Sequence, residues 1–241
     1  MESKWNRFGL SKVKIIVTAL CCLFALVSMG FVYRNSGETF DYFYCLATIP
    51  FVCLPIFLSI LFKWDLNPGF YITFSLYALG PILGAVYRLY YVTSWWDDLL
   101  HTLAGVLFAV FGAQIAVVLN KNKPTSYWLS ALFGLFFTIG IAVFWEFFEY
   151  SSDMLLGSDM QADTVVHYFA TKVGRLDGGV TVFDGIQSVV IDGNPLGVTG
   201  YLDIGLIDTI SDMAVETAGG VVYLLYVLID RDRHPLIRSA K

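Results

Sequence analysis

Residues 15–33 read IIVTALCCLFALVSMGFVY and contain no charged side chain. An α-helix rises about 1.5 Å per residue, so a stretch of this length reaches nearly across a hydrocarbon core about 30 Å thick. Similar stretches recur along the chain, in which 57% of the residues are hydrophobic and only 15% are charged. A soluble domain has about 25% charged residues. The composition therefore predicts a multi-pass membrane protein and excludes secreted, cytosolic and nucleic-acid-binding classes.

Six segments are long and apolar enough to be membrane-spanning helices. They cover residues 13–33, 42–62, 70–88, 98–119, 127–150 and 208–229. Together they predict an all-α polytopic fold in which residues 1–241 form a single integral membrane domain. Pro81 lies inside the third segment, where neighbouring helices tolerate a kink.

The basic residues predict the orientation, because lysine and arginine concentrate in cytoplasmic segments. Those at the two ends of the chain and in alternate loops all fall on one side: Lys4, Arg7, Lys12, Lys14, Lys63, Lys121, Lys123, Arg231, Arg233, Arg238 and Lys241. We therefore predict a multi-pass membrane protein with both termini in the cytoplasm. Residues 151–207 then form an extracytoplasmic loop. Within this loop, residues 180–191 are typical of a β-hairpin that turns at Asp184-Gly185.

Ionisable side chains cluster at the predicted outer ends of the last three helices. An ionisable residue in a span costs about 2.5 to 3.5 kcal/mol on insertion scales, so each is a functional candidate. The candidates are Asp97, Asp98, His101, Glu146, Glu149, Asp153, Asp208, Asp212 and Glu216. Spacings of three and four residues place the members from each helix on one face. Each of the three helices therefore carries one acidic stripe.

The three stripes are predicted to meet at one level. His101, Glu146 and Asp212 each lie about 27 to 29 Å from the cytoplasmic end of their helix, at about 1.5 Å per residue. Stripes of this kind are unfavourable against lipid, so we expect them to face one another or a water-filled pocket. Packed carboxylates need neutralisation, by protons, by Arg88 or by a bound cation.

The residue types favour a divalent metal ion as the cofactor. Carboxylates from several helices, with a carboxylate-x-x-His pair such as Asp98 and His101, are typical of metal sites in helix bundles. Mg²⁺, Ca²⁺, Mn²⁺, Fe²⁺ and Zn²⁺ all fit these ligands. Glu146 and Glu149 are the candidate catalytic residues, as a general base for a metal-bound water. Asp97, Asp98 and Asp208 also stand at helix starts, where a carboxylate equally well caps backbone amides.

Three ordered motifs carry a family resemblance. They are residues 96–101 (WDDLLH) with Gly105, residues 145–149 (WEFFE) with the segment 153–164, and residues 200–213 (GYLDIGLIDTISDM) with Gly219-Gly220. These motifs resemble the uncharacterised bacterial YjdF-like integral membrane family, and more closely its Gram-positive branch of membrane-spanning proteins. The resemblance implies a multi-helix membrane protein and brings no activity with it. It adds motif positions outside the spans: Asp153, Asp159, Gln161, Asp163 and Asp203.

This chain departs from the pattern of the YjdF-like family in two places. Glu216 stands where the pattern has asparagine, and the outer loop is longer than in the YjdF type. The glutamate differs from asparagine in both charge and reach, so the site of this chain is not an exact copy of a family site.

Three functions are compatible with the sequence. The first is an outward-facing metal site that acts on a lipid or envelope substrate. The second is a cation or proton transporter, although the inner halves of the last three helices offer few polar residues beyond Gln114, Ser130 and Thr138. The third is an accessory membrane protein whose polar cluster locks helices together around Arg88. Membrane lipids are the predicted partners, no nucleic acid is expected, and the oligomeric state stays open.

Overall fold

The computed structural model describes residues 11–121, 123, 125–229 and 237–239. The chain forms two compact units: a helical unit, Met1–Val143 with Asp212–Lys241, and a loop unit, Phe144–Ser211. Helices α7 (Tyr127–Leu156) and α8 (Leu206–Ile229) each begin in one unit and end in the other. Some of the basic residues that predict the orientation lie outside the described residues: Lys4, Arg7, Arg231, Arg233 and Lys241.

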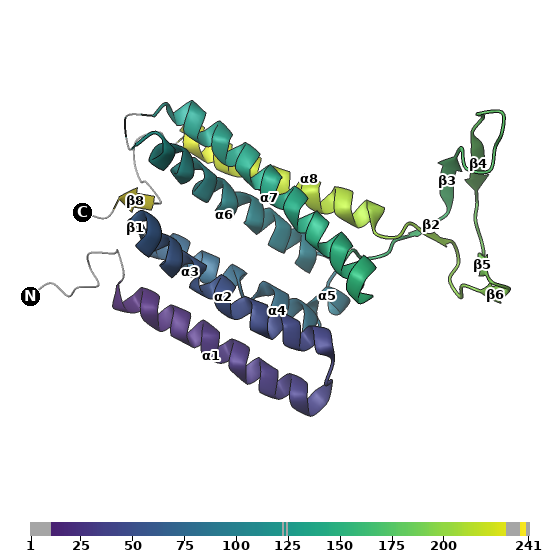
Figure 1. The fold of residues 1–241 in the computed structure, drawn as a ribbon, viewed down its shortest axis with the longest axis horizontal. Helices are drawn as coiled ribbons and strands as arrows, with labels where there is room; N and C mark the ends of the chain where they lie inside the picture. The colour runs from purple at the N-terminus through teal and green to yellow at the C-terminus, as the bar shows by residue number, and fades with distance from the viewer. Residues whose placement is uncertain (1–10, 122, 124, 230–236, 240–241) are drawn as a thin grey trace, which may run out of the picture. The chain divides into compact units, whose positions relative to one another are not determined.

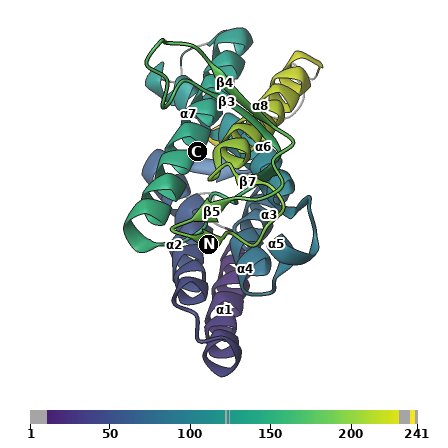
Figure 2. The ribbon, with the colours of Figure 1, turned by 90° about the vertical axis from the view of Figure 1, so that its right-hand side faces the viewer.

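Five helices of the described chain are long and apolar enough to cross a membrane (Figure 1). They are α1 (Lys12–Asn35), α2 (Thr39–Phe62), α6 (Trp96–Leu119), α7 and α8. The predicted class, a mostly helical membrane protein with a small β-containing segment, is confirmed. Figure 2 shows α1 running beside α2, and these two helices pack against each other along the helical unit.

The third predicted span is not one continuous helix. Residues 70–88 fall in α3 (Pro68–Tyr77) and α4 (Gly80–Ala85), and the short α5 (Leu89–Val92) follows them. Each of these three helices is too short to span a membrane by itself. Pro81 lies in the first turn of α4, where its missing N–H costs nothing, so the proline starts a new helix instead of kinking a longer one. Arg88 then adopts a left-handed conformation (φ 67°) immediately before α5.

Buried aromatic residues form the core of the helical unit. Tyr71 and Phe74 of α3 are fully buried and pack in one apolar cluster with Phe111 of α6. The strand β1 (Trp64–Leu66) pairs antiparallel with β8 (Ile237–Ser239). Lys14 is buried at the start of α1, where its Nζ lies 2.9 Å from Asp65 Oδ1. The ion pair fixes the start of α1 to β1.

The loop unit contains two hairpins and one further strand pair. The hairpins are β3 (Tyr168–Thr171) with β4 (Thr181–Asp184), and β5 (Val190–Ile191) with β6 (Asn194–Pro195); the remaining pair is β2 (Val165–Val166) with β7 (Tyr201–Leu202).

The predicted turn at Asp184-Gly185 is wrong. Asp184 ends β4 opposite Tyr168, whereas the tight turn forms at Asp192-Gly193, where both residues have positive φ. The chain contains three Asp-Gly pairs, at residues 177–178, 184–185 and 192–193, and local turn chemistry does not choose between them. Phe183 instead stacks on Phe169, with ring centroids 4.9 Å apart, which favours the pairing of β4 with β3.

Candidate functional site

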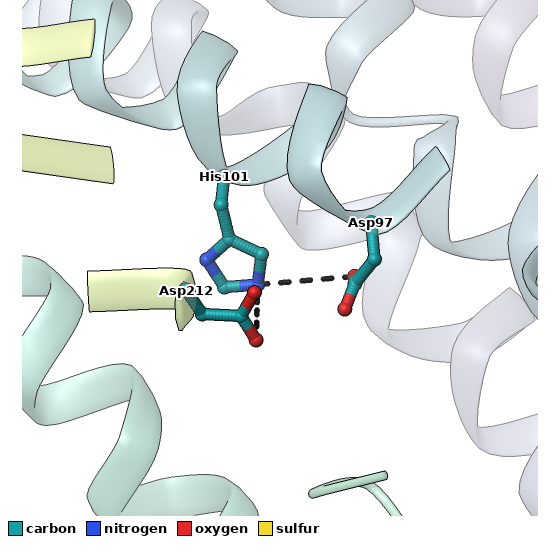
Figure 3. A group of neighbouring side chains, drawn as sticks. All are labelled: Asp97, His101 and Asp212. Carbon is teal, nitrogen blue, oxygen red and sulfur yellow. Dashed lines mark ion pairs between the residues drawn. The ribbon is translucent and has the colours of Figure 1, made fainter. Parts of the chain in front are cut away.

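Three ionisable side chains converge in the helical unit (Figure 3). His101 Nε2 lies 3.8 Å from Asp97 Oδ1 and 3.5 Å from Asp212 Oδ2. One ligand atom from each residue lies within 4.8 Å of the others. His101 and Asp212 are buried, and Asp97 is partly exposed. One imidazole nitrogen and two carboxylate oxygens in this arrangement can hold a metal ion. We call Asp97, His101 and Asp212 the triad.

A fourth ionisable group lies on the other edge of the imidazole ring. Glu216 Oε2 is 3.6 Å from His101 Nδ1, and the Glu216 side chain is almost fully buried. Its second oxygen, Oε1, accepts a hydrogen bond of 3.1 Å from the hydroxyl of Thr138 on α7. Because Asp212 and Glu216 are four residues apart on α8, both lie on the face that meets α6. The predicted meeting of the α6 and α8 stripes is thus observed.

Glycines allow α6 and α8 to approach closely enough for this meeting. A Cβ atom on Gly105 of α6 would overlap the main-chain carbonyl of Glu216, and one on Gly219 of α8 would overlap the carbonyl of Thr102. The two backbones are therefore in direct contact, as small residues permit in membrane helices. This contact holds Asp212 and Glu216 against His101.

Two predicted members of the cluster lie elsewhere. Asp98 is exposed on α6 and is not part of the triad, so Asp97, four residues before His101, replaces the predicted Asp98–His101 pair. Arg88 does not neutralise the cluster. Its NH2 nitrogen lies 3.9 Å from Oδ2 of the buried Asp41 at the start of α2.

Glu146 and Glu149 lie in the loop unit, on the last turns of α7. Both are buried, with 4% and 6% of their surface exposed. Trp145 Nε1 donates a 2.7 Å hydrogen bond to Glu149 Oε1. This hydrogen bond orients one of the two carboxylates. The roles predicted for Glu146 and Glu149, as metal ligands and as general base, stay predictions.

Asp153 and Asp208 organise the chain that follows α7. Asp153 Oδ1 accepts hydrogen bonds from the Ser158 hydroxyl and the Met160 amide, at 2.6 and 2.7 Å, and its Oδ2 accepts one from the Gln161 amide at 2.9 Å. Asp208 Oδ2 accepts a 2.9 Å hydrogen bond from the Ala162 amide. Both carboxylates were predicted as metal ligands. In the structure they bind main-chain donors, as loop-forming aspartates commonly do.

The remaining motif residues outside the spans belong, with Asp153 and Asp208, to one set of polar side chains that holds the loop in place. We call this set the loop scaffold. Asp203 accepts hydrogen bonds from the amides of Thr164 and Ile207, at 2.8 and 2.6 Å, and so ties the start of α8 to the residues before β2. Gln161 Nε2 donates to the Thr209 hydroxyl. Partial burial raises the pKa of Asp159, and the nearby carboxylates of Asp163 and Asp153 raise it further. Asp203 and Gln161 therefore connect the loop to the start of α8.

Comparison with known proteins decides the family. The model of a family described as "Predicted membrane protein (DUF2238)" matches residues 15–233. The chain belongs to this family. The matched region includes the whole triad and every residue of the loop scaffold. Searches among curated proteins and among solved structures found no match.

The three hydrogen bonds that Asp153 accepts lead to a testable prediction. Asp153→Ala removes the acceptor for three donors, so we expect it to destabilise the loop unit by about 1 to 3 kcal/mol. Limited proteolysis in detergent should then cleave within residues 157–164 faster than in the unaltered protein. Asp163→Ala is the control, because it also removes one negative charge but from an exposed side chain. It should leave the cleavage rate unchanged or lower it, since it relieves repulsion on Asp159. Equal acceleration by both variants would contradict the scaffold role.

Proposed function

We propose that this membrane protein binds a divalent metal ion through Asp97, His101 and Asp212. The observation that carries the proposal is the convergence of Nε2 of a buried histidine with two carboxylates, within 4.8 Å of one another. A mixed set of one nitrogen and two oxygen ligands suits Zn²⁺, Mn²⁺ or Fe²⁺ better than Ca²⁺, which prefers six to eight oxygens.

Charge balance supports a cation at this place. Asp97, Asp212 and Glu216 bring three carboxylates to one imidazole ring. Protonation of the ring would offset one of the three negative charges, whereas a divalent cation offsets two. Because uncompensated charge is costly in a buried site, a bound cation is the better counter-ion for the triad.

The proposal extends to orientation and chemistry. By the distribution of lysine and arginine, the triad faces the outer side of a bacterial cytoplasmic membrane, and both termini are cytoplasmic. Three protein ligands leave coordination positions for water and substrate, as catalytic metal sites do. Metal-assisted hydrolysis or group transfer on a lipid or envelope substrate therefore fits the ligand set. Within its family, we place the chain in the YjdF-like group and its Gram-positive branch.

A transport function has less support, because two of the few inner polar residues bind elsewhere. The Ser130 hydroxyl donates a 2.9 Å hydrogen bond to the Ala113 carbonyl, which joins α7 to α6. The Thr138 hydroxyl donates to Glu216. Both groups therefore serve helix packing and the site itself, and neither is left to line a path for ions.

Adjacent aspartates provide the test of metal binding. Asp97→Asn should weaken the binding of Zn²⁺ or Mn²⁺ at least about 10-fold, because it removes one charged ligand. Asp98→Asn is the matched control, since it is the same substitution one residue away on an exposed side chain. Titration calorimetry and elemental analysis of detergent-purified protein measure affinity and metal content.

Two results would contradict the proposal. One is an unaltered protein that binds no metal ion. The other is an equal loss of affinity in the Asp97→Asn and Asp98→Asn variants. If no metal binds and Asp97→Asn only lowers the yield of folded protein, the cluster is a structural lock between helices.

A further inference from the structure

We propose that Glu216 is a positioning residue for His101 and not a metal ligand. This inference rests on the metal site proposed above. The two ring nitrogens of His101 face different partners: Nε2 faces Asp97 and Asp212, and Nδ1 faces Glu216. Glu216 thus approaches the edge of the imidazole ring opposite to the proposed metal position. Its role differs from the ligand role that the sequence predicts.

The surroundings of Glu216 hold its carboxylate in place. Its Oε1 accepts the hydrogen bond from Thr138, whose side chain is fully buried. Its main-chain carbonyl lies against Gly105 of α6, at the point where a Cβ atom would overlap it. Three helices, α6, α7 and α8, therefore determine where Oε2 lies. A carboxylate restrained in this way can orient a neighbouring ring without moving toward a metal ion.

A carboxylate beside Nδ1 has a specific effect on the imidazole. Its negative charge favours the neutral tautomer that carries the proton on Nδ1, which leaves the lone pair on Nε2. Metal-binding histidines commonly have such a partner, which sets the ring orientation and raises the basicity of the ligating nitrogen. Here the lone pair would point at the space between Asp97 and Asp212. Glu216 would therefore prepare His101 to complete the triad.

The test compares Glu216→Gln with the unaltered protein. The substitution keeps the size of the side chain and removes its charge. We expect Zn²⁺ affinity to fall about 10- to 100-fold, the usual loss for such a partner, while the stoichiometry stays the same. Thr138→Val should also lower the Zn²⁺ affinity, but by less than Glu216→Gln does. Thr48→Val is the control for the threonine change, because Thr48 is also buried but its hydroxyl donates to the Tyr44 carbonyl within α2.

A spectroscopic measurement separates positioning from simple packing. The protein is labelled with ¹⁵N-histidine and studied by NMR without metal, at a pH where the ring is neutral. The ¹⁵N chemical shifts of the His101 ring should then report a proton mainly on Nδ1. Glu216→Gln should move the population toward the Nε2-protonated form, whereas Thr48→Val should not. Because no metal is present, this result stands apart from the metal titration. Failure of the proposed metal site and failure of the positioning role are therefore distinguishable.

Specific outcomes would overturn the inference. An unchanged tautomer population in Glu216→Gln, with unchanged Zn²⁺ affinity, would show that Glu216 only packs. Loss of the metal stoichiometry itself, as expected for the loss of a ligand, would show that Glu216 binds the ion directly. A Co²⁺ absorption spectrum with the same coordination number before and after substitution would support the positioning role.

Discussion

Replacing Gly219 by alanine is expected to destabilise the helical unit by about 3 kcal/mol, near the upper end of the cost of overpacking. The added methyl group would overlap the carbonyl of Thr102 and lie 3.0 Å from Cα of Gly105. Both neighbours are backbone atoms, so no side chain can rotate away to make room. Helices α6 and α8 would have to separate, and the separation would draw Asp212 and Glu216 away from His101.

Gly140→Ala is the matched control for this substitution. Gly140 is also a helical glycine of the helical unit, but a Cβ atom there would meet nothing within 4 Å. Alanine favours the helix over glycine by about 1 kcal/mol, so this variant should be as stable as the unaltered protein or more stable. Thermal unfolding in detergent, followed by tryptophan fluorescence, compares the two. Similar unfolding temperatures for Gly219→Ala and Gly140→Ala would show that α6 and α8 do not touch at Gly219.

His101→Gln is expected to abolish the stabilisation of the protein by metal. A ligand at 100 times its dissociation constant stabilises a folded protein by about 2.7 kcal/mol. For a chain of this size that corresponds to a rise of about 5 to 10 °C in the unfolding temperature. Without the imidazole, the triad keeps two carboxylates and loses its only nitrogen ligand, so the rise should disappear. Scanning calorimetry with and without Zn²⁺ measures it.

His167→Gln controls for metal bound loosely by any histidine. The Nδ1 atom of His167 lies 3.0 Å from the Ile186 carbonyl in the loop unit, and the side chain is exposed. This variant should keep the full rise in unfolding temperature. If His101→Gln kept the rise as well, the triad would not be the binding site.

The helical fold was largely predictable from hydrophobicity, because five of the six predicted spans are continuous helices in the structure. The exception is the segment that contains Pro81. Hydropathy averages over many residues and does not register where one missing N–H ends a helix. The strand pairing also escaped prediction, since Asp184-Gly185 and Asp192-Gly193 carry the same turn signal. Contact between Phe169 and Phe183, fourteen positions apart, decided between them.

The candidate site was predictable in part. Spacing along α6 and α8 predicted that Asp97, His101, Asp212 and Glu216 share faces that meet, and the structure brings these residues together. Spacing did not distinguish Asp97 from Asp98, because positions three and four before a histidine both share its face. No pattern linked Thr138 to Glu216, which lies 78 residues later in the chain.

The sequence by itself determined that this chain is a membrane protein and that its acidic residues gather at one end of three helices, because both properties follow from hydropathy and helical period. Only the tertiary structure decided which carboxylates face a histidine and which bind backbone amides. Asp212 and Asp153 look alike in the sequence, but Asp212 faces His101 of another helix, whereas Asp153 accepts hydrogen bonds from the amides of the loop that follows it. The chemistry of a carboxylate depends on the donors around it, and those donors come from distant parts of the chain.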